Sequence, residues 1–199
     1  VIDAMPTDGF VHVPFEYPST RVSIEQAAGY LHSTIESLTD VSKISFVVHS
    51  MGGLVVRRYL QEHSDPRIHR MVMLGTPNMG SPCADLLDIG FDLFGEKVQA
   101  VSQLTTSFAE EFNRTVTQRR GVKFSALAGN SVPFSCKWSG AGDGVVTVES
   151  AHWLVSDKAL SDSIHTELTG TKDFTNFVKP RLAIGPKGNH MPAPPDIRH

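Results

Sequence analysis

The sequence lacks the features that mark several classes of protein. No apolar run approaches the roughly 18 residues that a membrane-spanning helix needs, and no signal peptide is visible. An excess of charge of one sign is also absent, because 18 Lys and Arg nearly balance 21 Asp and Glu and give a net charge of −3. The densest basic spots are the pairs Arg57-Arg58 and Arg119-Arg120, so we expect no nucleic-acid partner. The chain does not begin with Met, and a secreted and a cytoplasmic location both stay open.

Cysteine is scarce, and Cys83 and Cys136 are the two that occur. A disulfide between them would imply an oxidising compartment, whereas two thiols would not, and the sequence leaves both states open. Neither cysteine has the spacing of a metal ligand, so we expect no metal site. No cofactor is expected either.

What is present fits one well-packed domain of ordinary composition, with 199 residues, 40% hydrophobic and 20% charged. Stretches with strand character alternate with helical patterns, one of which follows a capping box formed by Ser23 and Gln26. The expected strands are 10–15, 43–48, 70–74, 122–128 and 145–148, and the expected helices are 24–38 and 53–62. Residues 173–184 are expected to form a final helix or a strand followed by a helix. Near-continuous apolar strands between helices indicate an α/β fold with a mostly parallel sheet that helices cover on both faces.

Two regions differ from this alternation. Residues 78–121 carry many apolar side chains without the period of a strand, and we expect helices there, interrupted at Gly90 and Gly95. Residues 186–199 are rich in proline, and we expect a disordered tail. The domain is therefore expected to span residues 1–185.

The most informative stretch is 44–53, Ile-Ser-Phe-Val-Val-His-Ser-Met-Gly-Gly. A buried strand, a sharp turn and a helix there would present the Ser50 hydroxyl at the carboxyl end of the sheet as a nucleophile elbow. The strained turn is expected to require small residues two positions either side of Ser50. Gly52 meets this requirement, whereas Val48 stands where Gly is usual, and Gly53 adds clearance for the helix. The alternative is a Ser-Gly turn without chemistry.

A serine hydroxyl needs a basic partner, which in turn needs a third group to orient it. In this type of fold the order along the chain is Ser, then an acid, then His. Asp143 lies among glycines after the third strand and is our candidate acid, although an Asp-Gly pair is also a common turn. Competing acids are Asp157 and Asp162, in a polar stretch, and Glu149.

The base must come from nine histidines, most of which precede the acid or lie in the tail. His165 leaves room for one more strand before it, and we prefer it to His152, which adjoins Trp153. His165 would accept the Ser50 proton as Ser50 attacks an acyl carbonyl, and Asp143 would orient His165. The backbone N–H of Met51 and a second donor would hold the oxyanion, and water would resolve the acyl-enzyme.

These motifs resemble the α/β-hydrolase superfamily, lipase/esterase type. The resemblance covers residues 9–180 and rests on Phe-Val-Val-His-Ser-Met-Gly-Gly-Leu-Val-Val-Arg, Met-Leu-Gly-Thr-Pro-Asn-Met-Gly-Ser, Gly-Asp-Gly-Val-Val and His-Thr-Glu-Leu. It implies the triad roles of Ser50, Asp143 and His165, and a small helical cap or lid over 78–121. Members of the family usually carry a His-Gly strand that supplies the second oxyanion donor. No His-Gly pair precedes Ser50, so we expect that an N-terminal segment is missing from this chain.

The sequence thus predicts a serine hydrolase that cleaves small-molecule or lipid esters. Other serine acyl transfer, by a thioesterase, amidase or acyltransferase, and an inactive hydrolase-like fragment are the alternatives. Phe91, Leu93 and Phe94 are expected to line an acyl pocket or form a lid, unless they simply pack on the sheet. Exposure of these side chains would favour a lipase that contacts a lipid surface, and burial would favour an esterase. The oligomeric state stays open.

Overall fold

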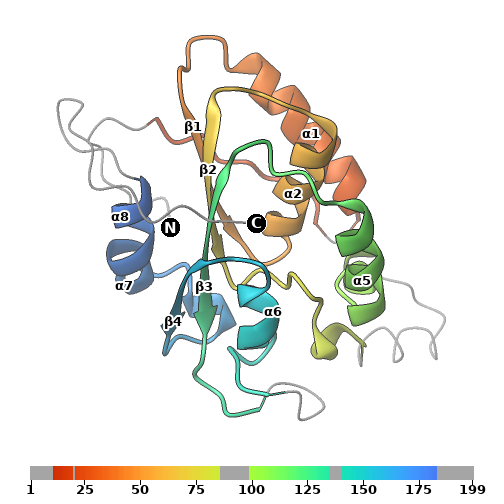
Figure 1. Cartoon of the computed structure of the whole chain (residues 1–199), viewed down its shortest axis with the longest axis vertical. Coiled ribbons are helices and arrows are strands. Elements are labelled where there is room, and N and C mark those ends of the chain that lie inside the picture. Colours follow the sequence, from red (N-terminus) through yellow and green to blue (C-terminus); the bar gives the residue numbers. More distant parts are fainter. Residues whose placement is uncertain (1–10, 20, 86–98, 135–139, 183–199) are drawn as a thin grey trace.

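The computed structural model describes residues 11–19, 21–85, 99–134 and 140–182. One parallel sheet of four strands, in the order β1-β2-β3-β4, forms the centre of the domain (Figure 1). The strands are β1 (Ile44–His49), β2 (Ile68–Leu74), β3 (Lys123–Gly129) and β4 (Asp157–Ser161). Because all four strands are parallel, their carboxyl ends meet at one edge of the sheet, as the sequence predicts for an α/β fold.

Helices cover both faces of this sheet (Figure 1). One face carries α1 (Ile24–Ser37), α2 (Gly52–Glu62), α5 (Thr106–Thr115) and α6 (Val148–His152). The other face carries α7 (Thr171–Asp173) and α8 (Lys179–Leu182), joined by a π-helical turn at Phe174–Val178. The described residues 171–182 thus form one continuous helical segment, in agreement with the helical alternative expected for 173–184.

The two faces of β2 enter two separate cores. Met71 and Met73 pack in the core that contains residues of α1 and α2, whereas Val72 and Leu74 pack with Phe174 and other side chains of the C-terminal helical segment. Successive side chains of the strand point to opposite faces of the sheet. Because helices cover both faces, the strand is apolar at nearly every position. This explains the near-continuous apolar runs in the sequence.

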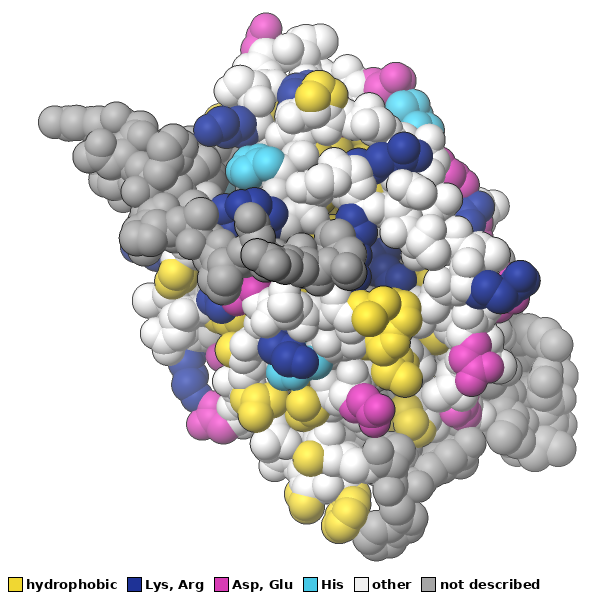
Figure 2. Space-filling view, in the orientation of Figure 1, with side chains coloured by type: hydrophobic (Ala, Val, Ile, Leu, Met, Phe, Trp, Pro, Cys, Tyr) yellow, Lys and Arg dark blue, Asp and Glu magenta, His cyan; other side chains and the backbone are white. Residues whose placement is uncertain are grey.

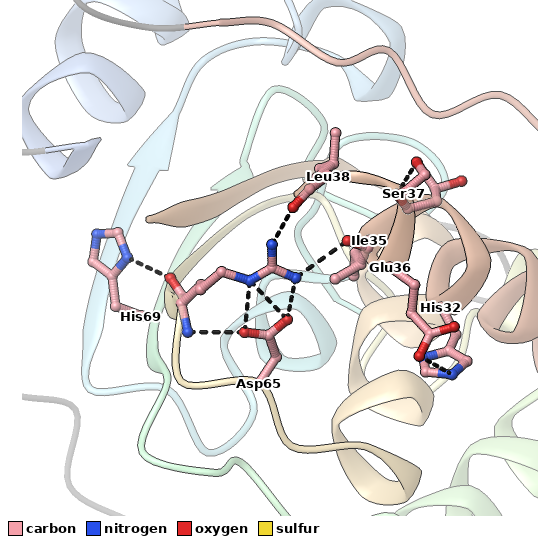
Figure 3. Close-up of polar contacts among 9 residues, drawn as sticks. His32, Ile35, Glu36, Ser37, Leu38, Asp65 and His69 are labelled. Atoms are coloured by element: carbon pink, nitrogen blue, oxygen red, sulfur yellow. Dashed lines mark hydrogen bonds and ion pairs between the residues drawn. The ribbon is translucent and has the colours of Figure 1, made fainter. Parts of the chain in front are cut away.

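Helix α1 begins and ends at defined contacts. The side chain of Ser23 accepts a hydrogen bond from the Gln26 N–H at 3.1 Å and Gln26 Oε1 accepts one from the Ser23 N–H at 2.9 Å, which confirms the capping box. At the other end, the guanidinium of Arg67 donates to the carbonyl of Ile35 at 3.2 Å and to the carbonyl of Leu38 (Figure 3). Asp65 holds that guanidinium at 2.6 Å. A cation thus binds carbonyls at the helix C-terminus.

Two expected strands are absent. Of the strand expected at 10–15, the described residues 11–15 form no strand, and Val11 and Val13 are exposed. Residues 145–148 are also not a strand, since Thr147 caps α6 by accepting a hydrogen bond from the Ser150 N–H at 3.1 Å. The fourth strand is β4, which lies where room for one more strand was expected before His165, in a stretch predicted only as polar.

The segment 78–121 contains α4 (Gln99–Ser102) and α5 within its described part, and residues 86–98 lie outside it. Arg57 on α2 ties this segment to the domain, donating to Asn78 Oδ1 at 3.0 Å and to Asn113 Oδ1 on α5 at 2.8 Å. Burial, together with the nearby charge of Arg119, lowers the pKa of Arg57 to about 9. The helix α5 is thereby fixed beside α2.

Other sequence-based expectations concern the surface and the termini. On the face shown in Figure 2, Lys and Arg side chains lie in several separate places among polar and apolar ones. Within the described residues, no helix has the length and apolar character that a membrane span requires. Cys83 is disulfide-bonded, and Cys136 and the expected tail at 186–199 lie outside the described residues.

Candidate active site

Ser50 occupies a strained turn between β1 and α2. Its φ of 52° lies in the left-handed region, which non-glycine residues rarely adopt. The Ser50 N–H donates to the carbonyl of Leu74 in the neighbouring strand at 3.0 Å, and the Ser50 carbonyl accepts from the Gly53 N–H at 3.2 Å. Such strain costs about 1–3 kcal/mol and persists where the surroundings hold the backbone. The strand, turn and helix therefore agree with the expected elbow geometry.

The steric requirements at the turn differ from the expected ones. A β-carbon on Gly52 would lie 3.5 Å from the Val48 β-carbon, which is an ordinary contact, so position 52 does not require glycine. A β-carbon on Gly53 would instead lie 2.3 Å from Thr76 Oγ1. Position 53 is therefore the one that requires glycine, because α2 passes close to the end of β2 there.

The structure brings Ser50, His165 and Asp143 together, from positions 50, 143 and 165 of the chain. His165 Nε2 lies 3.0 Å from Ser50 Oγ, and His165 Nδ1 lies 2.7 Å from Asp143 Oδ2. A carboxylate can only accept a hydrogen bond, so Nδ1 carries the proton and Nε2 of a neutral ring presents its lone pair to the hydroxyl. This arrangement can remove a proton from Ser50.

Hydrogen bonds from its own loop fix the orientation of the Asp143 carboxylate. Asp143 is 2% exposed, and its Oδ1 accepts hydrogen bonds from the N–H groups of Val145 at 2.9 Å and Val146 at 2.8 Å. Its backbone carbonyl accepts from the His165 N–H at 3.0 Å. A β-carbon on Gly129, at the end of β3, would lie 2.5 Å from the Asp143 β-carbon. The close approach of loop and strand therefore needs glycine at 129.

The competing acids and base have other partners. Asp157 in β4 forms an ion pair with Arg181 at 2.6 Å and accepts a hydrogen bond from Ser125 at 2.6 Å, and Asp162 pairs with Lys172. Glu149 lies in the first turn of α6. His152 lies 2.8 Å from the carbonyl of Ala159 through Nε2. None of these four has a hydrogen bond to Ser50, His165 or Asp143.

A cavity of about 320 Å³ opens beside Ser50. Tyr17, Ser19, Met51 and Leu104 line it. Met51 begins α2, and its N–H has no acceptor among the described residues, so it is free to donate into the cavity. Burial raises the pKa of the Tyr17 hydroxyl, which is therefore protonated at neutral pH. The cavity has a size typical of small-molecule sites.

Other expected features of the site lie outside the described part. Phe91, Leu93 and Phe94, the expected substrate-binding residues, belong to the undescribed residues 86–98. Among the residues that the structure describes, no group of three His, Cys, Asp or Glu side chains could hold a metal ion.

His49 is a neighbour of the site that the sequence analysis set aside. Its Nε2 lies 2.8 Å from the backbone carbonyl of His165, and the two ring centroids are 4.6 Å apart. Burial lowers the pKa of His49, and the hydrogen bond to His165 opposes that shift. Its position directly before Ser50 was the signal that could have drawn attention to it.

Comparison with known proteins agrees with this fold. The family model described as the alpha/beta hydrolase fold matches residues 10–128. Among solved structures, the mature form of the Bacillus licheniformis lipase BlEst2 is similar with a TM-score of 0.64 and 24% identity, over 80% of this chain and 74% of that one. No curated protein sequence matches the chain significantly.

In two further similar structures, this chain matches a smaller share of the other protein's length. The metagenomic carboxyl esterase MGS0156 is similar with a TM-score of 0.61 and 20% identity, over 73% of this chain and 52% of that one. The phospholipase PlaB from Legionella pneumophila is similar with a TM-score of 0.51 and 18% identity, over 71% of this chain and 36% of that one. The chain also spans 43% of the BlEst2 propeptide form. At these identities the likeness is one of fold.

Proposed function

Because this chain belongs to the alpha/beta hydrolase fold family, we propose that it is a serine hydrolase that cleaves carboxylic esters. In this proposal Ser50 is the nucleophile, His165 the general base and Asp143 the group that orients it. One observation carries the proposal: hydrogen-bond distances of 3.0 Å and 2.7 Å connect Ser50 Oγ to His165 and His165 to Asp143. The fold alone hosts many activities, so the argument rests on these side chains.

The proposed reaction has two halves. His165 Nε2 accepts the proton of Ser50 Oγ while Oγ bonds to the ester carbonyl carbon, and Asp143 stabilises the resulting imidazolium. The tetrahedral intermediate then expels the alcohol, which receives its proton from His165. Water, deprotonated by His165, then attacks the acyl-enzyme and forms a second tetrahedral intermediate. Its collapse releases the acid as His165 returns the proton to Ser50 Oγ.

The oxyanion of both intermediates needs hydrogen-bond donors. The Met51 N–H is the first proposed donor, because it follows the nucleophile, begins α2 and has no acceptor among the described residues. The partial positive charge at the helix N-terminus adds to its effect. We assign no second donor.

The surroundings of Ser50 favour an ester with an apolar acyl group. The cavity beside Ser50 includes the apolar side chains of Met51 and Leu104, and its volume of about 320 Å³ suits a small substrate. Val145, two residues after Asp143, and Ile164, directly before His165, are 38% and 42% exposed. We therefore include two features in the proposal. The apolar cavity side chains favour an ester substrate, and the exposed Val145 and Ile164 favour transient contact with a lipid surface.

Hydrolysis of p-nitrophenyl esters of graded acyl length tests the proposal. The protein is expected to release p-nitrophenol, most rapidly from short esters, and Ser50→Ala and His165→Ala are expected to remove this activity. Ser33→Ala, at the exposed face of α1, is the control and should keep it. Full activity in Ser50→Ala would contradict the proposal. Activity on thioesters or amides but not esters would instead favour the alternative acyl-transfer chemistry.

A further inference from the structure

His49 connects the turn that carries Ser50 to the loop that carries His165. It is the last residue of β1, and its Nε2 lies 2.8 Å from the His165 backbone carbonyl, 116 residues along the chain. A carbonyl can only accept, so His49 Nε2 carries the hydrogen and donates it. The hydrogen bond therefore connects the backbone of His165 to His49, the residue directly before Ser50.

We propose that His49 is a positioning residue, which holds the His165 imidazole at the Ser50 hydroxyl through this bond to the His165 backbone. The inference rests on the proposed function, because it assigns a role within the same reaction. In this role His49 transfers no proton.

Other hydrogen bonds also hold the loop that carries His165. The His165 N–H donates to the Asp143 carbonyl at 3.0 Å. Ser161 and Ser163, which precede His165, each donate to the buried carboxylate of Asp173 at 2.7 Å. These contacts fix the loop to the acid and to the C-terminal helical segment. The His49 bond adds the connection to the Ser50 turn, which sets the distance between Oγ and Nε2.

The charge of His49 suits this role. The titratable groups that act on it are His165 and Asp143, and burial is the largest influence, lowering the pKa of His49. His49 is therefore neutral at neutral pH. A neutral ring places no second positive charge beside His165 when His165 takes up the serine proton, with ring centroids 4.6 Å apart.

Matched variants separate positioning from stability. His49→Phe keeps a ring of similar size without the donor, and His49→Gln restores a donor. His152→Phe is the control, because His152 makes the same kind of bond, 2.8 Å from Nε2 to the Ala159 carbonyl, and burial lowers its pKa too. It has no hydrogen bond to Ser50, His165 or Asp143.

The measurement is the rate at which a fluorophosphonate labels Ser50 across pH, together with kcat and KM on p-nitrophenyl butyrate and the melting temperature of each variant. His49→Phe is expected to lower both the labelling rate and kcat about 10- to 100-fold, with KM little changed and an altered pH profile, because small misplacements of a reacting group cost rates of this order. His49→Gln should recover much of the rate. His152→Phe should lower the melting temperature but leave the pH profile unchanged.

Two outcomes overturn the inference on its own: a His49→Phe protein with wild-type kcat and pH profile, or an equal loss of kcat in His152→Phe. A wild-type protein with no hydrolysis that depends on Ser50 would overturn the proposed function as well. The two failures are therefore distinguishable in one set of assays.

Discussion

Gly75 lies against the carboxylate of Asp143. A β-carbon added to Gly75 would lie 3.0 Å from Asp143 Oδ2 and 3.2 Å from His165 Nδ1, the two atoms that share a hydrogen bond. Gly75 also has a φ of +58°, which L side chains rarely adopt. The end of β2 therefore leaves the space in which the acid and the base meet.

Gly75→Ala is expected to displace this pair and lower esterase activity by about tenfold or more, because the pair has little room to shift. Gly121→Ala is the matched control, since its φ of +77° carries similar strain and nothing lies within 4 Å of the added carbon. Both variants should lose roughly 1 kcal/mol of stability or more. Equal activity in the two variants would show that the space at Gly75 does not matter for the reaction.

The two glycines after Met51 should respond differently to alanine. Gly53→Ala should destabilise the protein by about 1–3 kcal/mol, because the added carbon would lie 2.3 Å from Thr76 Oγ1. Gly52→Ala should change stability little, since its added carbon makes an ordinary contact at 3.5 Å with Val48. Denaturant unfolding of both variants measures the difference, and a larger loss in Gly52→Ala would refute the steric account of the turn.

Asp143 and Asp157 are buried carboxylates to which we assign different roles. Asp143→Asn should lower kcat on the order of 10⁴-fold, because an amide can donate to His165 Nδ1 and fix the wrong tautomer. Asp157→Asn should leave kcat nearly unchanged and lower the melting temperature, because it weakens the contacts to Arg181 and Ser125. A loss of kcat in Asp157→Asn with Asp143→Asn active would exchange the two assignments.

Asp65 should make a pH-dependent contribution to stability. Its hydrogen bonds with Arg67 lower the pKa of the folded carboxyl below its ordinary value, which is the value expected in the unfolded chain. The stabilisation is therefore present above about pH 4 and is lost as the pH falls through the lowered pKa. The melting temperatures of the wild type and Asp65→Asn should differ most near pH 7 and converge toward pH 3. A constant difference would argue against this ion pair.

Local patterns in the sequence predicted much of the fold. The capping box at Ser23, the strand before Ser50 and the helix after it depend on near neighbours, and all three are present. The prediction of a strand at 145–148 was wrong. Thr147 caps a helix there, which outweighs the strand propensity of these residues, and α6 begins at Val148. The bounds of β4, for which the sequence left room before His165, could not be predicted because the strand is polar and lies at the sheet edge, where Asp157 pairs with Arg181, 24 residues away.

In the candidate site, too, contacts between residues far apart in the sequence could not be predicted. The elbow at Ser50 and the order Ser, Asp, His along the chain selected two residues, Ser50 and Asp143, that the fold places within hydrogen-bond distance of the third, His165. It could not select His49, whose contact with His165 spans 116 residues. Nor could it distinguish Gly52 from Gly53, because the neighbour that requires clearance is Thr76, in the loop that follows β2.

The most direct test of the proposed chemistry is covalent labelling of the wild-type protein and of Ser50→Ala with a fluorophosphonate, followed by peptide mapping by mass spectrometry. The account predicts one adduct, on Ser50, formed by the wild type, formed much more slowly by His165→Ala and not formed by Ser50→Ala. A wild-type protein in which Ser50 stays unlabelled, or a Ser50→Ala protein labelled at the same rate, would contradict it.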